Sequence, residues 1–154
     1  MITKLENSNE EVANQIRRVF QRSYKIEAEL IGVCDFPPLA RSIKQIVNAP
    51  TDFYGFIDNH FLAAILEIDI KEKQLDIHSL TVDPTFFRKG IADKLISFVL
   101  KSFDINTATV ETAEVNQPAI NLYKKHGFIE FKRCTPSHGI PKVAMSINPL
   151  SYNV

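Results

Sequence analysis

The sequence predicts a mixed α+β domain in which a mostly antiparallel sheet is joined to one parallel strand pair. Residues 52–82 contain three runs with the alternating apolar pattern of strands, separated by short polar turns. Such runs form antiparallel hairpins. Residues 75–115 then show a strand, helix and strand pattern, and a crossover of that length joins parallel strands. Together the two patterns indicate a sheet that changes direction part-way along the chain.

The first third of the chain predicts two helices. A short strand at residues 2–5 is followed by Ser8, Asn9 and two glutamates, a typical helix start with a serine or asparagine cap. Apolar residues then recur at helical spacing as far as about Tyr24. A second helix is predicted at residues 39–47, ending before Pro50.

The remaining elements follow from the same two periodicities. Strands are expected where apolar residues alternate, and helices where they recur every three or four positions. Gly127 is expected to end the last helix in a left-handed conformation. The predicted strands are 52–57, 61–70, 74–82, 107–115, 128–134 and 142–147, and the predicted helices are 91–103 and 118–126.

Composition narrows the class of protein. The chain has 154 residues, with 18 Lys and Arg balanced by 18 Asp and Glu. We therefore expect residues 1–154 to form a single domain, with neither nucleic acid nor a membrane as its partner. Cys34 and Cys134 are far apart, and no residues have metal-ligand spacing, so we expect a cytoplasmic protein without a metal site.

One turn has the features of an anion site. Arg88, Lys89, Gly90, Ile91 and Ala92 lie between a strand and a predicted helix. The first amides of a helix have no partner within it and carry partial positive charge. A glycine lets a ligand approach the backbone closely. The sequence therefore predicts a phosphate-binding turn, although it is neither a P-loop nor a dinucleotide-binding fingerprint.

Two segments resemble the GCN5-related N-acetyltransferase (GNAT) superfamily. The first is Leu80-Thr81-Val82-Asp83-Pro84 with the phosphate-binding turn that follows it. The second, residues 116–128, is similar to that family's Asn-x-x-Ala-x-x-Leu-Tyr-x-x-x-Gly-Phe pattern at every defined position. The resemblance implies a central mixed sheet with a splayed parallel pair and about four flanking helices. Phe87 departs from it, since the family usually has Gln or Arg there.

The resemblance also implies the activity and the cofactor. Members transfer an acetyl group from acetyl-CoA to a primary amine of a small molecule or peptide by direct attack. The pantetheine arm adds to a strand edge, and the pyrophosphate lies on the turn. The matching cofactor-binding residues here are Leu80, Thr81, Val82, Arg88, Lys89, Gly90, Ile91, Ala92, Asn116, Ala119 and Tyr123.

One residue is the candidate acid, and three are candidates for the base. By resemblance, the Tyr123 hydroxyl lies near the thioester sulfur and can protonate the leaving thiolate. Asp76 and His78 alternate with apolar residues along one strand, so both point to the same face. Histidine titrates near neutrality and suits a general base, with Asp76 orienting it or acting through a water. Glu67 is a third candidate base. The alternatives are that these groups only face solvent, or that no side chain serves as base.

The acceptor and the biological role stay open at this stage. By resemblance, residues 24–39 and 136–142 build the acceptor site. Within it, the run Cys34-Asp35-Phe36-Pro37-Pro38 could form an apolar wall with one carboxylate, or could equally be a packed loop. A non-catalytic acyl-CoA-binding or sensing domain on the same fold is the main alternative. Loss of the cofactor site and use of another acyl group are two more. A homodimer would be consistent with the resemblance.

Overall fold

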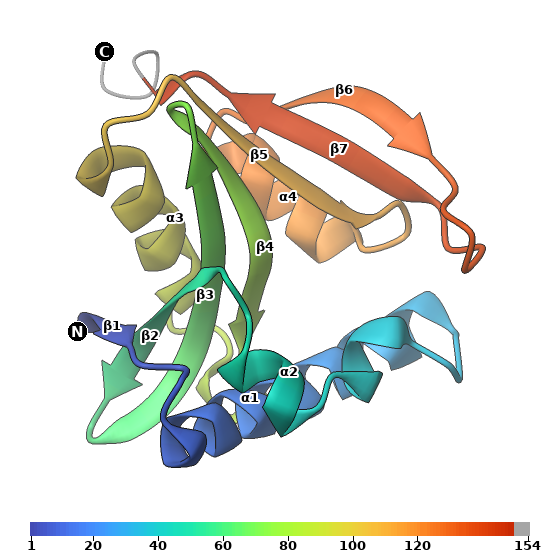
Figure 1. Ribbon diagram of the computed structural model, residues 1–154. Coiled ribbons are helices and arrows are strands. Elements are labelled where there is room, and N and C mark those ends of the chain that lie inside the picture. Colours follow the sequence, from blue (N-terminus) through green and yellow to red (C-terminus); the bar gives the residue numbers. More distant parts are fainter. Residues whose placement is uncertain (150–154) are drawn as a thin grey trace.

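The computed structural model describes residues 1–149 and shows a seven-stranded sheet with helices on both faces (Figure 1). The strand order is β1-β2-β3-β4-β5-β7-β6, and only β4 and β5 run parallel. The elements are β1 (Ile2–Leu5), α1 (Glu10–Ile31), the 3₁₀ turn η1 (Pro37–Ala40), α2 (Ile43–Val47), β2 (Asp52–Asp58), β3 (Phe61–Lys71), β4 (Gln74–Val82), the 3₁₀ turn η2 (Pro84–Phe86), α3 (Ile91–Ser102), β5 (Thr107–Ala113), α4 (Gln117–Lys125), β6 (Ile129–Cys134) and β7 (Lys142–Ile147). The predicted fold class is confirmed.

Helix α1 begins as predicted and ends later than predicted. The Asn9 side chain accepts hydrogen bonds from the amides of Glu11 and Val12, at 2.9 and 3.2 Å. The helix continues past Tyr24 to Ile31, and Gly32 ends it with a φ of 83°. Ile26 and Leu30 in its last turns are exposed. The regular spacing of buried apolar residues, from which a helix is predicted, therefore stops before the helix ends.

The predicted second helix, at residues 39–47, is wrong as a continuous element. The structure has η1, then an extended Arg41, then the short helix α2. Arg41 leaves the helical conformation and its side chain forms a bidentate ion pair with Glu67 on β3. Ser42 and Gln45 then form a capping box that starts α2 afresh. A tertiary contact therefore overrides the local helical pattern.

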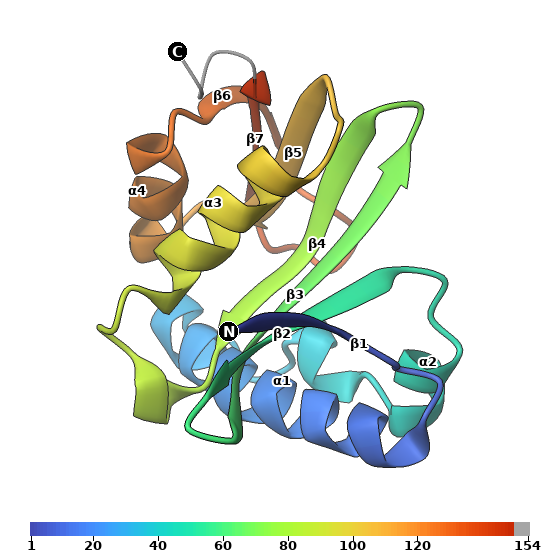
Figure 2. The same cartoon turned by 90° about the vertical axis from the view of Figure 1, so that its left-hand side faces the viewer.

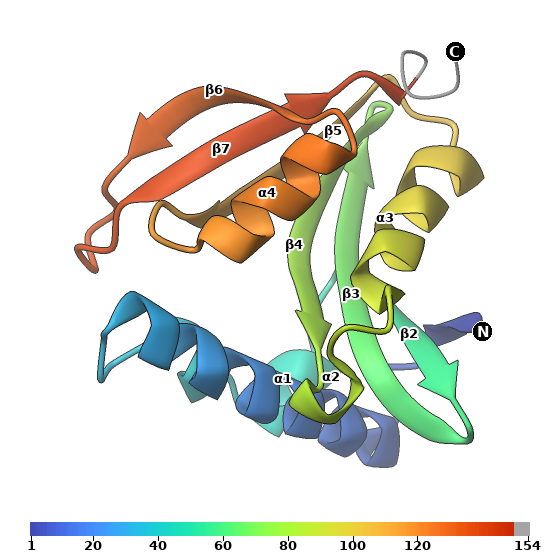
Figure 3. The same ribbon diagram turned by 180° about the vertical axis from the view of Figure 1, so that it is seen from behind.

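Two hydrophobic cores hold the sheet between its helices. One lies under α3 and α4 and includes Leu66, Leu95 and Met145. The other lies under α1 and α2 and includes Phe20 and Ile65. Figures 2 and 3 show α3 and α4 on one side of the sheet and α1 on the other. The two faces of β4 therefore point into differently built environments.

Candidate active site

Strands β4 and β5 stop pairing half-way along β4. Their paired residues run only from Gln74 to Ile77 on β4, while the pairing of β4 with β3 continues to Val82. His78 is an extra residue with no partner on β3, which makes a β-bulge. The backbone edge of residues 78–82 therefore faces a gap, and Figure 3 shows the two halves of the sheet separating toward α1.

Two cavities adjoin this gap. The α3 cavity, of about 380 Å³, lies at the N-terminus of α3. It is lined by the predicted phosphate-binding turn, by Val82 and by the exposed end of α1. The central cavity, of about 400 Å³, lies between α1, β4, β5 and the start of β7. Glu27, Leu80 and Asn116 line both cavities, so they mark the junction between the two.

The predicted phosphate-binding turn opens directly into the α3 cavity. Gly90 has a φ of 73° and precedes the first residue of α3, with no side-chain cap on the helix. The amides of the first helical turn therefore lack acceptors within the helix and face the cavity mouth. Arg88, Gly90, Ile91 and Ala92 all line the cavity. This geometry suits a polyphosphate.

Two side chains of the turn depart from the expected pattern. Lys89 was expected among the cofactor-binding residues, but its Nζ lies 3.4 Å from Asp58 and 5.1 Å from the Phe86 ring centroid. Lys89 is absent from the lining of the α3 cavity. Phe87 does line it and is 45% exposed. The wall that the family usually builds with a polar side chain is therefore apolar here.

The three predicted edge residues of β4 divide between the two faces of the sheet. Leu80 and Val82 pack beside the core under α3 and line the cavities. Thr81 is paired with Ile65, which belongs to the core under α1, and its side chain is buried on that face. Only the backbone of Thr81 is therefore available to a ligand in the gap, as strand addition requires.

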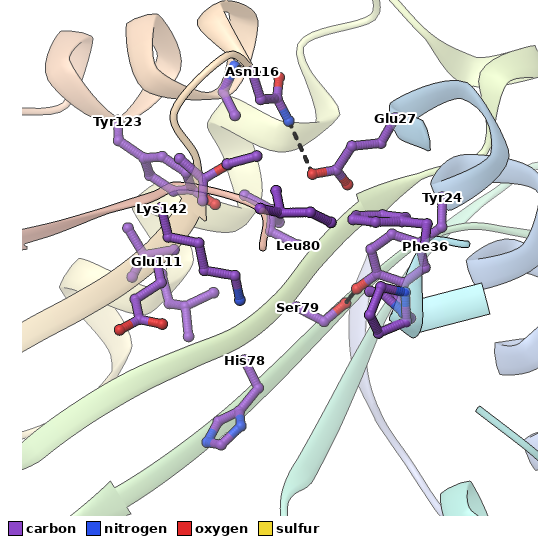
Figure 4. A pocket seen from close by; sticks show the side chains of 18 of the residues that line it. Tyr24, Glu27, Phe36, His78, Ser79, Leu80, Glu111, Asn116, Tyr123 and Lys142 are labelled. Atoms are coloured by element: carbon purple, nitrogen blue, oxygen red, sulfur yellow. Dashed lines mark hydrogen bonds between the residues drawn. The ribbon is translucent and has the colours of Figure 1, made fainter. Parts of the chain in front are cut away.

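The second motif places Asn116, Ala119 and Tyr123 along the junction. Asn116 caps α4 by accepting a 3.4 Å hydrogen bond from the Ala119 amide, and its Nδ2 donates to Glu27 at 3.1 Å. Ala119 and Tyr123 line the central cavity. Tyr123 is 5% exposed and packs edge-on against Phe128. Figure 4 shows Asn116 and Glu27 joined above Leu80, with Tyr123 on the other side of the cavity.

Burial controls the protonation of Tyr123. Withdrawal of the hydroxyl from water raises the pKa of Tyr123 well above its usual value, and the nearby Tyr24 and Glu27 raise it further. Tyr123 therefore stays protonated at physiological pH and carries its proton at the cavity wall.

Asp76 and His78 lie on one face, as expected, but do not form a dyad. Both line a third cavity, of about 410 Å³, with Thr109, Glu111 and Lys142. The Asp76 carboxylate accepts hydrogen bonds from Thr109 and Gln74. Within residues 1–149 there is no hydrogen bond between Asp76 and His78. His78 is exposed at the bulge and also lines the central cavity.

Glu67, the third candidate base, is bound to other side chains. It is 2% exposed, and Arg41 donates to its two oxygens at 2.6 and 2.9 Å. Thr51 Oγ1 donates at 2.6 Å to the second oxygen. The Arg41 guanidinium also lies 5.6 Å from the ring centroids of Phe20 and Phe53. These contacts assign Glu67 a structural role and argue against a proton acceptor there.

Comparisons with known proteins identify the family of this chain. The family model described as "Acetyltransferase (GNAT) family" matches residues 12–128. The chain belongs to this family. It is 32% identical over 141 residues to the Bacillus subtilis (strain 168) protein called UPF0157 protein YqkA. That alignment covers 91% of this chain and 41% of the relative, so the chain spans about two fifths of the length of this curated relative.

Solved structures of acetyltransferases share the fold. The ribosomal-protein-S18-alanine N-acetyltransferase of Escherichia coli superposes with a TM-score of 0.76 at 18% identity, over 96% of this chain and 92% of the other. The PaiA N-acetyltransferase of Thermoplasma acidophilum, solved with coenzyme A, gives 0.73 at 18% identity, over 96% and 98%. At such identities the likeness establishes the fold.

The central cavity of this GNAT domain contains residues that the sequence motifs do not mark. Residues 24–39 and 136–142 do contribute to it, through Tyr24, Glu27, Phe36 and Lys142 among others. Tyr24 donates a 3.0 Å hydrogen bond to Ser79, and burial raises its pKa well above the usual range. Helical spacing of Tyr24 and Glu27, one turn apart, was the available signal that both face one way.

Residues 1–149 lack two other kinds of site. Those residues contain no group of three His, Cys, Asp or Glu side chains placed to hold a metal ion. None of their helices is both long and apolar enough to cross a membrane.

Proposed function

We propose that this chain is an N-acetyltransferase that moves an acetyl group from acetyl-CoA to a primary amine of a small molecule or peptide. The observation that supports it most is the open edge of β4 between two adjoining cavities. One cavity ends at the unpaired amides of α3, and the other is lined by charged side chains. A long phosphorylated cofactor and a separate acceptor would each have a place.

The cofactor would lie along the gap. Its pyrophosphate would accept hydrogen bonds from the amides of Ile91 and Ala92, with Arg88 close by. Its pantetheine arm would pair with the backbone of residues 80–82. The exposed apolar side chains of Ile26, Leu30 and Phe87 would cover the rest of the cofactor in place of the polar side chain usual in the family.

The reaction is a direct displacement. The amine nitrogen attacks the thioester carbonyl, a carbon–nitrogen bond forms and the carbon–sulfur bond breaks. The attacking amine gives up a proton, for which His78 is the candidate acceptor, through water and with Asp76 on the same face. The departing thiolate takes a proton from Tyr123. Each such proton transfer contributes about 10²–10⁴-fold.

The first experiment measures binding and turnover separately. Thermal unfolding is followed with acetyl-CoA, CoA and succinyl-CoA, and thiol release is then measured against a panel of amines. Acetyl-CoA at 100 times its dissociation constant should add about 2.7 kcal/mol of stability. Stabilisation with turnover supports the proposal. Stabilisation without turnover of any amine would favour a sensing domain, and no stabilisation would refute both.

The role of His78 has its own test. His78→Ala should lower kcat/KM and remove the loss of rate on the acidic side of the pH–rate profile. Lys132→Gln on the exposed face of β6 serves as a control for surface substitution. An unchanged profile and rate in His78→Ala would remove His78 from the mechanism.

A further inference from the structure

Lys142 lies in the central cavity without an ion-pair partner among the described residues. It is half-buried at the start of β7, and no described residue forms an ion pair or hydrogen bond with its side chain. Figure 4 shows its ammonium extending into the middle of the cavity, away from the Glu111 carboxylate. Partial withdrawal of an unpaired ammonium from water is unfavourable, so this position favours an incoming anion.

Glu27 offers the opposite charge on the opposite wall. Its Oε1 accepts the 3.1 Å hydrogen bond from Asn116, and its second oxygen has no hydrogen-bond partner within the described chain. Burial raises the pKa of Glu27, while the Asn116 hydrogen bond and the charge of Lys142 lower it in part. The charge of Lys142 therefore acts on the Glu27 carboxylate although the two side chains form no ion pair. The second oxygen of Glu27 can accept a hydrogen bond from the ammonium of a ligand.

The two charges differ in their position relative to the cofactor. Glu27 lines both cavities, whereas Lys142 lines the central cavity and not the α3 cavity. A ligand with an ammonium at Glu27 and an anion at Lys142 would therefore lie with its amine toward the junction. The junction also holds Leu80, beside which the thioester would arrive. This orientation is the one that acetyl transfer needs.

We propose that the acceptor is a small amine that carries an anionic group close to its amino group, such as an α-amino acid. The proposal rests on the acetyltransferase function proposed above and specifies its substrate class. Glu27 would receive the ammonium and Lys142 the anion. A polyamine or aminoglycoside would instead bring a further ammonium group toward Lys142, and that repulsion disfavours it.

The rest of the cavity fits a small zwitterion. Phe36, Pro37 and Pro38 form an apolar wall beside Tyr24, whose ring centroid lies 5.8 Å from that of Phe36. An apolar side chain could pack there. Glu111 also lines this cavity, but it is exposed, and no ion pair joins it to Lys142 among the described residues.

The experiment compares amines that differ only in the anion. Thiol release from acetyl-CoA is measured with glycine, leucine and phenylalanine and with their C-terminal amides. Phosphoethanolamine, putrescine, kanamycin and a tetrapeptide are added. For the preferred side chain, the acid should exceed the amide in kcat/KM by about 10- to 100-fold, as one charged hydrogen bond predicts. Phosphoethanolamine shows whether phosphate replaces carboxylate.

Variants separate the anion contact from the intrinsic reactivity of each amine. The acid-to-amide ratio should fall toward that of the uncatalysed amines in Lys142→Gln and persist in Lys142→Arg. Lys132→Gln, an exposed lysine on the neighbouring strand β6, should leave it unchanged. The stabilisation by acetyl-CoA, measured for each variant, verifies that the cofactor site is folded.

Three results would overturn the inference. If Lys142→Gln leaves the acid-to-amide ratio of kcat/KM unchanged, Lys142 does not bind the anionic group of the acceptor. Higher kcat/KM for putrescine, kanamycin or the tetrapeptide would assign a different substrate class. In both cases acetyl transfer itself would stand. Absence of transfer to every amine would refute the proposed function and this inference together.

Discussion

The α3 cavity and the central cavity are built from different parts of the chain. The α3 cavity presents helix amides, a glycine in the left-handed region and a strand edge, which are backbone features, and they lie beside the apolar side chains of Ile26, Leu30 and Phe87. The central cavity presents Glu27, His78, Lys142 and Tyr123, all of them side chains. The first should tolerate side-chain changes and respond to changes in backbone conformation. The second should respond to single functional groups.

The largest expected effect is on turnover, in the central cavity. Tyr123→Phe should lower kcat by about 10²–10⁴-fold, because the thiolate then leaves without a proton donor. The stabilisation by acetyl-CoA should stay nearly the same, because the ring and its contact with Phe128 remain. Steady-state kinetics and thermal unfolding measure the two. Tyr54→Phe, which packs against Phe98 and Phe103 in the core, is the control.

A kcat within a few-fold of the wild type would show that water protonates the thiolate. Tyr123 would then be a packing residue. The expectation that single side chains of the central cavity control turnover would lose its main support.

The next effect is on the free energy of unfolding and concerns the ion pair between Arg41 and Glu67. Arg41→Met leaves the buried Glu67 carboxylate without its cation, which should cost about 3 kcal/mol. We expect the lower end of the usual range, because the Arg41 side chain is 28% exposed. Urea denaturation measures the loss. The stabilisation by acetyl-CoA should persist, because the α3 cavity lies elsewhere.

The double variant Arg41→Met with Glu67→Met should regain most of that loss, since the unpaired charge is gone. Glu130→Gln, which breaks an exposed ion pair with Arg133, should leave the free energy of unfolding unchanged within error. A loss in Arg41→Met no larger than in Glu130→Gln would mean that Arg41 does not anchor this wall.

A smaller effect should depend on pH. Asp83 is buried beside the phosphate-binding turn and links it to α1 through Arg22. Burial alone would raise the pKa of Asp83, but hydrogen bonds from Arg22 and from Thr85 outweigh it and lower the pKa. The carboxylate therefore contributes stability above its unfolded-state pKa of about 3.9, and this is lost as the pH falls through the folded-state value.

Asp83→Asn should consequently cost about 1–2 kcal/mol at pH 7, as expected for charged hydrogen bonds, and less at pH 3. Urea denaturation at both pH values measures the difference. Asp52→Asn, which breaks an exposed pair with Lys4, is the matched control. A cost that is equal at both pH values would contradict the ionic explanation.

The smallest effect compares two glycines of equal geometry. Gly90 and Gly32 have φ values of 73° and 83°, and a Cβ at either would meet no described atom within 4 Å. Alanine at either position should cost about 1 kcal/mol, because the left-handed region disfavours a side chain. Only Gly90→Ala should weaken acetyl-CoA binding, since its methyl group would face the pyrophosphate. Isothermal titration checks this, and equal affinities would contradict a backbone-built site.

The same contrast explains which features could be predicted from the sequence. Gly90, Asn116 and Tyr123 belong to motifs of neighbouring residues, and a local motif encodes a local backbone geometry. Glu27 and Lys142 are 115 positions apart in the chain, and only the packing of α1 against the sheet brings them to one cavity. No local pattern could reveal that pair.

A tertiary contact also accounts for the error in the predicted second helix. The helix expected over residues 39–47 is broken because Arg41 forms an ion pair with Glu67 on β3. A charge distant in sequence decided the outcome, and periodicity does not record such a charge.

A crystal structure of the protein with coenzyme A would test the central claim most directly. We predict pyrophosphate oxygens within hydrogen-bonding distance of the Ile91 and Ala92 amides, and pantetheine paired with the β4 backbone at residues 80–82. Coenzyme A bound elsewhere, or a β4–β5 gap closed by strand pairing beyond Ile77, would contradict the account.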